Sequence, residues 1–222
     1  MMKISNDTKD VLKNFSTINS GIRVKTGNKL ETISNMKNIL AVATVAEDFP
    51  QDFSIYNLPE FLGATSLMDD PDFQFNDSSL SVADNNSSLA YFYAAEGMVT
   101  APDKMITMPE AEIEFKVTST LLTDLKKAAA VLGVNDLILK SDGTNVTLVV
   151  TDKKSPTSNT FSRIVGEGDG TTYDMNFKME NLKILDGNYD VQVSSKGISH
   201  FNNADVDLEY FIALEPDSKY NA

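Results

Sequence analysis

A short block of sequence occurs twice in this chain of 222 residues. Residues 89–96 (LAYFYAAE) and 208–215 (LEYFIALE) share Leu, Tyr, Phe, Ala and Glu at matching positions. Each block follows the same order of patterns: an amphipathic helix, an extended apolar segment, a short helical stretch and alternating strands. This self-similarity indicates duplication. We therefore predict two similar domains, residues 1–108 and 109–222, joined by the proline-containing connector 99–112.

Each half is predicted to combine helices with strands. Strand patterns, with alternating hydrophobicity and β-branched residues, occur at residues 21–27, 39–47, 80–84, 136–141, 145–152, 189–194 and 205–214. Amphipathic helices are expected at residues 6–19 and 119–132, with shorter ones after Asn57 and at residues 179–185. Two helices and several strands per half define an α+β fold class.

The two long helices carry lysine opposite their apolar faces. Helical spacing gathers one apolar stripe from Val11, Leu12, Phe15 and Ile18. Lys9 and Lys13 fall on the other side of that helix, and Lys126 and Lys127 lie opposite the leucine face of the second. Both helices are therefore predicted to pack on a sheet and to present lysine outward. An ordinary solvated face is the alternative interpretation.

The charge of the chain is negative but unevenly distributed. The net charge is −13, from 19 basic and 32 acidic residues, and a uniformly acidic surface would repel nucleic acid. No lysine or arginine occurs between Lys37 and Lys104, whereas basic residues dominate residues 3–25. This distribution is compatible with a protein that is acidic outside and has a local basic lining. An acidic surface that only aids solubility is the alternative.

The sequence predicts no catalytic residue, cofactor or metal site. The chain has no cysteine and a single histidine, His200, which is expected at a loop or strand end. The glycines of residues 166–170 lack the lysine of a phosphate-binding loop, and Asp69, Asp70 and Asp72 lack EF-hand spacing. The first residues do not resemble a signal peptide, and the apolar runs are too short to span a membrane, so an intracellular protein is expected.

Several segments together resemble the sliding clamps of large tailed phages. The most specific is residues 3–28, whose LKNF-x-TINSG stretch is similar to the end of the first inner helix in that family. The resemblance continues through residues 53–70 (FSIYNLPEFLGATSLMDD), 99–104 (VTAPDK) and the closing residues 187–218. It spans essentially the whole chain.

This resemblance implies a ring. Two similar clamp domains per chain would close as a homotrimer, so that six domains surround a hole, with helices lining it and sheets outside. The implied partners are duplex DNA, bound without sequence preference, the replicative DNA polymerase and an ATP-driven clamp loader. The implied role is non-enzymatic processivity in viral DNA replication, in the cytoplasm of the infected host cell, without cofactors and without a membrane.

The resemblance and the helix faces together give candidate residues. The DNA-facing lysines are expected to be Lys9, Lys13, Lys126 and Lys127, supported by Lys3, Lys178 and Lys183. A pocket for partner peptides is expected from Val99, Met105, Ile106, Met108, Leu214 and Pro216. Edge strands for subunit contacts are expected near residues 146–150 and 67–80.

Two other functions remain open from the sequence. One is a β-rich phage structural or adhesion protein whose acidic loops are stabilised by calcium. The other is a hydrolase that uses a serine and His200. A calcium-dependent rise in melting temperature would favour the first, and loss of an activity in His200→Ala would favour the second.

Overall fold

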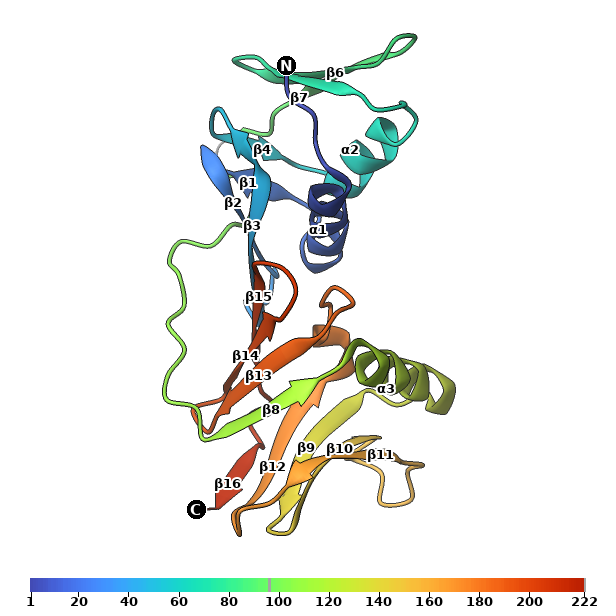
Figure 1. Ribbon diagram of the computed structural model, residues 1–222, viewed down its shortest axis with the longest axis vertical. Coiled ribbons are helices and arrows are strands. Elements are labelled where there is room, and N and C mark those ends of the chain that lie inside the picture. The colour runs from blue at the N-terminus through green and yellow to red at the C-terminus, as the bar shows by residue number, and fades with distance from the viewer. Residues whose placement is uncertain (96, 222) are drawn as a thin grey trace. The chain divides into compact units, whose positions relative to one another are not determined.

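A computed structural model of the chain describes residues 1–95 and 97–221. It divides into two compact units, Met1–Met105 and Ile106–Ala222, and each contains a long helix and its own strands (Figure 1). Glu96, the last residue of the first repeated block, lies outside the described residues.

Unit 1 packs two helices on antiparallel strands. The helices are α1 (Asn6–Ile18) and α2 (Leu58–Thr65). The strands are β1 (Ile22–Val24), β2 (Gly27–Ile33), β3 (Ile39–Phe49), β4 (Phe53–Ile55), β5 (Asp72–Phe75), β6 (Ser79–Ala83) and β7 (Ser88–Phe92). β1 pairs with β4, β2 pairs with β3, and β5, β6 and β7 form a sheet in that order. Leu12 of α1 and Phe61 of α2 line the same apolar core as Ile22 and Val24 of β1.

Unit 2 has one long helix, α3 (Ser119–Leu132), and a single 3₁₀ turn, η1 (Met179–Asn181). Its strands are β8 (Ile113–Val117), β9 (Asp136–Asp142), β10 (Asn145–Thr151), β11 (Phe161–Glu167), β12 (Thr172–Lys178), β13 (Tyr189–Ser194), β14 (Ile198–Asn203), β15 (Leu208–Ala213) and β16 (Lys219–Asn221). One sheet has the order β11-β10-β9-β12-β16, and β8, β13, β14 and β15 pair successively.

The pairing scheme of unit 1 recurs in unit 2, which confirms the duplication. The pairs β1–β4 and β2–β3 correspond to β9–β12 and β10–β11, and the order β5-β6-β7 corresponds to β13-β14-β15. The repeated blocks form the equivalent strands β7 and β15. The chain before each long helix also pairs equivalently, through the bridge Met2–Phe73 in unit 1 and through β8 with β13 in unit 2.

The ends of the long helices are set by local capping. The Ser5 hydroxyl accepts a hydrogen bond from the Thr8 backbone N–H, and the Thr118 hydroxyl accepts one from Leu121 N–H, both at 3.2 Å. α3 ends where Gly133 adopts a left-handed φ of 67°. Because these signals are contained in a few neighbouring residues, both long helices were predictable, and their predicted ranges are confirmed.

The prediction of a helix at residues 179–185 is wrong. Only η1 is helical there, and the backbone leaves the helical region at Leu182. Leu182 and Ile184 are buried while Lys183 between them is exposed, so burial follows the period of two of an extended chain.

One of the predicted edge strands also needs correction. Residues 146–150 lie in β10, which pairs with β9 on one side and β11 on the other, so they form no edge. The alternating burial of β10 shows which of its faces packs on the core but not which strands lie beside it, which explains the error. Residues 67–80 contain β5, which ends the sheet β5-β6-β7 and carries only the Met2–Phe73 bridge on its other side, so this part of the prediction needs no correction. Within their own units, β7 and β11 each end a sheet.

Glu47 of β3 holds the first turn of α1. Its carboxylate accepts hydrogen bonds from the Ser5 backbone N–H, at 2.5 Å, and from the Thr8 hydroxyl. Burial alone would raise the pKa of Glu47, but the hydrogen bonds from Thr8 and Ser5 outweigh it, and the pKa is lowered. The charged form is therefore favoured in the folded state.

We expect Glu47→Gln to lower the free energy of unfolding by about 1–2 kcal/mol at neutral pH, because charge-assisted hydrogen bonds are lost. The folded pKa lies below the unfolded one, so this contribution is complete above the unfolded pKa and disappears as pH falls through the folded pKa. Urea unfolding of wild type and variant should therefore converge in acid. Asp48→Asn, at the exposed neighbour on the same strand, is the control, and an equal loss at both positions would contradict the assignment.

Candidate nucleic-acid interface

α1 presents a polar face with mixed charge. Val11, Leu12, Phe15 and Ile18 are buried as expected. Lys9 is half-buried, and Lys13 is exposed and lies 3.0 Å from the Asp10 carboxylate. The Lys13 ammonium is thus partly neutralised on its own helix, whereas Lys9 has no ion-pair partner among the described residues.

α3 presents two lysines in different surroundings. Leu122, Leu125 and Ala129 form its buried side. Lys126 donates a hydrogen bond to the Ile184 carbonyl at 3.1 Å and lies 3.5 Å from Asp186. Lys127 is exposed and has no ion-pair partner in the described part of the chain. Lys127 is therefore the more available cation of this helix.

The three supporting lysines differ from one another. Lys3 lies 3.0 Å from Asp70 and 3.6 Å from Asp72, and the hydrogen bond to Asp70 is the main cause of its raised pKa. Lys183 is exposed beyond η1. Lys178 is directed inward and lies 2.5 Å from the carboxylate of Asp136, whose side chain is 4% exposed.

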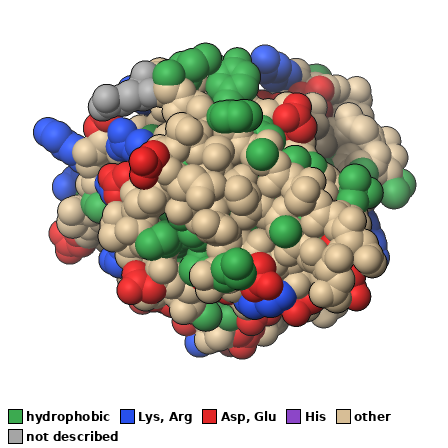
Figure 2. All heavy atoms as spheres, turned by 90° about the horizontal axis from the view of Figure 1, so that it is seen from above, with side chains coloured by type: hydrophobic (Ala, Val, Ile, Leu, Met, Phe, Trp, Pro, Cys, Tyr) green, Lys and Arg blue, Asp and Glu red, His purple; other side chains and the backbone are tan. Residues whose placement is uncertain are grey.

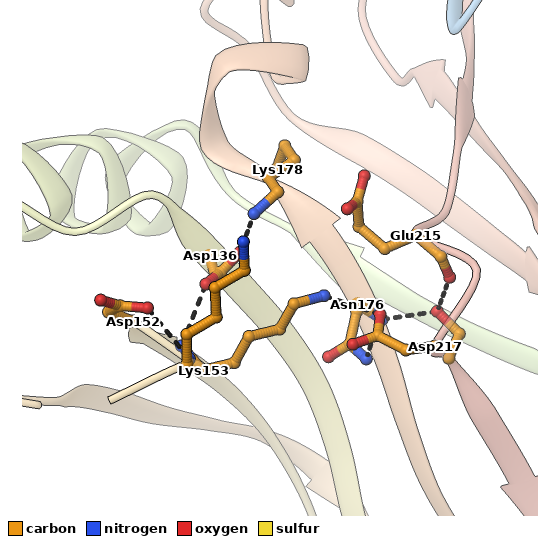
Figure 3. A network of polar contacts seen from close by, with 9 residues as sticks. Asp136, Asp152, Lys153, Asn176, Lys178, Glu215 and Asp217 are labelled. Carbon is orange, nitrogen blue, oxygen red and sulfur yellow. Dashed lines mark hydrogen bonds and ion pairs between the residues drawn. The ribbon is translucent and has the colours of Figure 1, made fainter. Parts of the chain in front are cut away.

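Lys178 belongs to a polar network at the C-terminal end of unit 2 (Figure 3). The second oxygen of Asp136 accepts a hydrogen bond from the Lys153 backbone N–H at 3.0 Å, and the Lys153 ammonium lies 2.7 Å from Asp217. That ammonium is the main cause of the lowered pKa of Asp217. Asn176 completes the network by donating a side-chain hydrogen bond to Asp217 at 3.3 Å. These contacts fix the last strands of the unit.

The predicted partner-peptide residues fall in both units. Val99 lines a pocket of about 290 Å³ in unit 1. Met105 and Ile106, in the connector, are 50% and 36% exposed, and Met108 is half-buried. In unit 2, Leu214 is buried and Pro216 is exposed. A single pocket formed by all six residues remains a prediction.

Two residues of the Val99 pocket were missed by sequence reasoning. Tyr56 and Met98 line it together with Asn19 and Asn57, and they are 59% and 58% exposed. Large apolar side chains at the surface beside a pocket are typical of peptide-binding sites. The available signal was Tyr56 at the end of a strand, after the buried Ile55.

His200 does not lie at a loop or strand end as predicted; it lies inside β14, paired with Gln192 of β13 and Phe211 of β15. The histidine and the acidic loop both have structural partners. His200 Nε2 lies 2.8 Å from Glu209, and the ring stacks on Phe211 with centroids 4.5 Å apart. In the acidic loop, Asp70 and Asp72 face Lys3. No group of three or more His, Cys, Asp or Glu within the described ranges could hold a metal ion.

None of the helices in the described part of the chain has the length and apolar content that a membrane crossing needs.

Comparisons with known proteins agree over nearly the whole chain. The family model described as "DNA polymerase processivity factor" matches residues 5–101, and "gp45 sliding clamp, C terminal" matches residues 114–216. The sliding clamp of Vibrio phage KVP40 is 36% identical over 96% of this chain and 99% of its own length, and that of Enterobacteria phage T4 is 30% identical over 99% and 100%. Among solved structures, PCNA of A. fulgidus, bound by the C-terminal region of FEN-1, superposes with a TM-score of 0.67 at 13% identity, covering 95% of this chain and 96% of that one.

Proposed function

The chain belongs to the phage sliding-clamp family of DNA polymerase processivity factors, and we propose that three copies close into a ring around duplex DNA. The main observation in support of this function is the duplicated sliding-clamp fold, in which each unit has one long helix that bears lysine on its polar side. We infer that the ring acts through its topology and catalyses no reaction. Once closed, it cannot leave the duplex sideways, so the replicative polymerase attached to it stays on the template.

The free sheet edges support the proposed trimer. Two domains per chain require three chains for six domains, and a head-to-tail arrangement joins two different surfaces. β7 and β11 supply such surfaces, with Phe92 and Ile164 at 72% and 69% exposure. In Figure 2, the middle of the face seen from above is mainly hydrophobic or uncharged, and most charged side chains lie toward its margin. Interface centres are depleted of charge in this way.

The helix lysines support sequence-independent DNA contact. Lys9 and Lys127 have no ion-pair partner among the described residues, so they can approach phosphates without breaking an ion pair. Phosphate contacts position DNA without reading its bases. Lys13 and Lys126 contribute less because carboxylates already neutralise part of their charge.

Partners are proposed to attach through short peptide tails. The exposed connector residues Met105 and Ile106 offer apolar contacts to such a tail, and the pocket lined by Val99 adds Tyr56 and Met98 beside mainly polar side chains. The A. fulgidus clamp, which has the same fold, is bound by the C-terminal region of FEN-1. We infer that the polymerase and an ATP-driven loader use this mode here, in the cytoplasm of the infected host.

The DNA assignment is tested by Lys9→Glu/Lys127→Glu. We expect shorter synthesis products at low salt, an unchanged trimer mass, and a difference that shrinks as salt rises, because the contacts release counterions. The matched control is Lys154→Glu/Lys196→Glu, which makes the same charge change at exposed positions of unit 2. If wild type and both double variants were equally processive at low salt, the hypothesis that Lys9 and Lys127 contact the DNA would be refuted.

A further inference from the structure

Unit 1 contains a basic groove that the proposed function does not use. Arg23, Lys25 and Lys29 line a pocket of about 330 Å³ at the β1–β2 turn. The other lining residues are Thr26, Gly27, Asn28 and Glu31. All three cationic residues are exposed.

The groove lies on the sheet face away from α1. Ile22 and Val24 are buried against the core that contains Leu12 of α1, so Arg23 between them is directed to the opposite face. Lys29 likewise precedes the fully buried Leu30. In a clamp whose helices face the DNA, this face does not meet the encircled duplex.

The groove has more cations than nearby carboxylates. Asp52, whose pKa is lowered chiefly by hydrogen bonds from Thr26, also interacts electrostatically with Lys25 and Arg23, but at more than ion-pair distance. The only ion pair of the groove among the described residues joins Lys25 to Glu31 at 3.5 Å. Arg23 and Lys29 have no carboxylate within ion-pair distance in residues 1–95 and 97–221. The Asp52 carboxylate accepts hydrogen bonds from the backbone N–H and hydroxyl of Thr26, at 2.7 and 2.8 Å.

The duplication provides an internal comparison. The equivalent β9–β10 hairpin of unit 2 carries Lys140, which lies 3.7 Å from Asp174, and the turn residue Asp142. The fold therefore does not require an excess of cations at this hairpin. In a chain of net charge −13, an unpaired basic groove is also not explained by solubility.

We propose that the groove formed by Arg23, Lys25 and Lys29 binds a carboxylate-rich segment of a partner protein. A guanidinium binds a carboxylate through two parallel hydrogen bonds, and the two ammonium groups beside it suit further carboxylates. The pocket admits a few side chains. The three cations surround one local pocket and do not follow an extended track, as a continuous phosphate backbone would need, so a peptide fits better than nucleic acid. The inference needs only unit 1 and does not depend on ring closure.

The test is a titration of the full chain with fluorescein-labelled hexaglutamate, followed by anisotropy at low salt. We expect Arg23→Glu/Lys29→Glu to weaken binding about tenfold or more, since two charge-assisted contacts become repulsive. Lys154→Glu/Lys196→Glu, with the same change in net charge, should bind like wild type. Carbodiimide cross-linking should join the peptide to Lys25 and Lys29 rather than to Lys140.

Three outcomes would overturn the proposal. In the first, Arg23→Glu/Lys29→Glu binds the peptide as tightly as wild type; in the second, Lys154→Glu/Lys196→Glu loses as much affinity as the groove variant. In the third, a short duplex DNA binds more tightly than the peptide, and the groove variant weakens that DNA binding. The third would assign the groove to nucleic acid. Processivity and trimer mass, measured on the same variants, separate this site from the clamp function.

Discussion

Phe92→Asp is expected to convert the trimer into separate chains and to abolish processive synthesis. Phe92 is exposed on β7, a strand of five residues without charge that ends its sheet. A carboxylate at the centre of a contact between chains would be buried without a partner, at a cost of about 2–4 kcal/mol for each interface. All three interfaces of the ring carry the change. Sedimentation equilibrium at micromolar concentration measures the mass.

The control is Leu67→Asp, because Leu67 is 85% exposed in the same unit but outside any strand. Ile164→Asp on β11 should act like Phe92→Asp. A mixture of the two variants gives the sharpest result, because each keeps one intact surface. In a head-to-tail arrangement the mixture forms pairs but no closed trimers. A stable trimer in either single variant would place the subunit contact elsewhere.

Lys178→Met is expected to destabilise the protein by about 3 kcal/mol, because it leaves the buried carboxylate of Asp136 without its cation. Lys178→Met/Asp136→Asn removes both charges and should recover most of that loss. Lys127→Met, at an exposed lysine, should change stability by less than about 0.5 kcal/mol. Urea unfolding at neutral pH provides all three values. A stable Lys178→Met protein with reduced processivity would show instead that Lys178 contacts DNA.

Most of the architecture was predictable because its signals are local or repeated. Caps at Ser5 and Thr118 define the long helices, and the repeated blocks at β7 and β15 reveal the duplication. The failures concern pairing between distant residues. Strand alternation identified β10 but could not show that β9 and β11 occupy both its sides. Residues 179–185 contain helix-compatible residues, and tertiary burial of Ile184 favoured an extended chain.

The sequence predicted which helix faces carry the lysines of the candidate site, but not which carboxylates pair with those lysines. The apolar stripe of α1 placed Lys9 and Lys13 on its polar side, and the structure agrees. The partner of Lys178 comes from β9, far away in sequence, so spacing gave no sign of it. Tyr56 and Met98 were missed for the same reason, since their shared pocket exists only after folding.

The carboxylates beside Lys13 and Lys126 have a consequence for motion along DNA. A lysine that already has Asp10 or Asp186 within about 3.5 Å loses little free energy when a phosphate moves away, because the carboxylate takes its place. In the proposed ring, the free energy along the helical axis of the duplex would then rise and fall by small steps, comparable with the thermal energy of about 0.6 kcal/mol. One-dimensional diffusion over so smooth a profile is fast, and the ring can keep pace with the polymerase it serves.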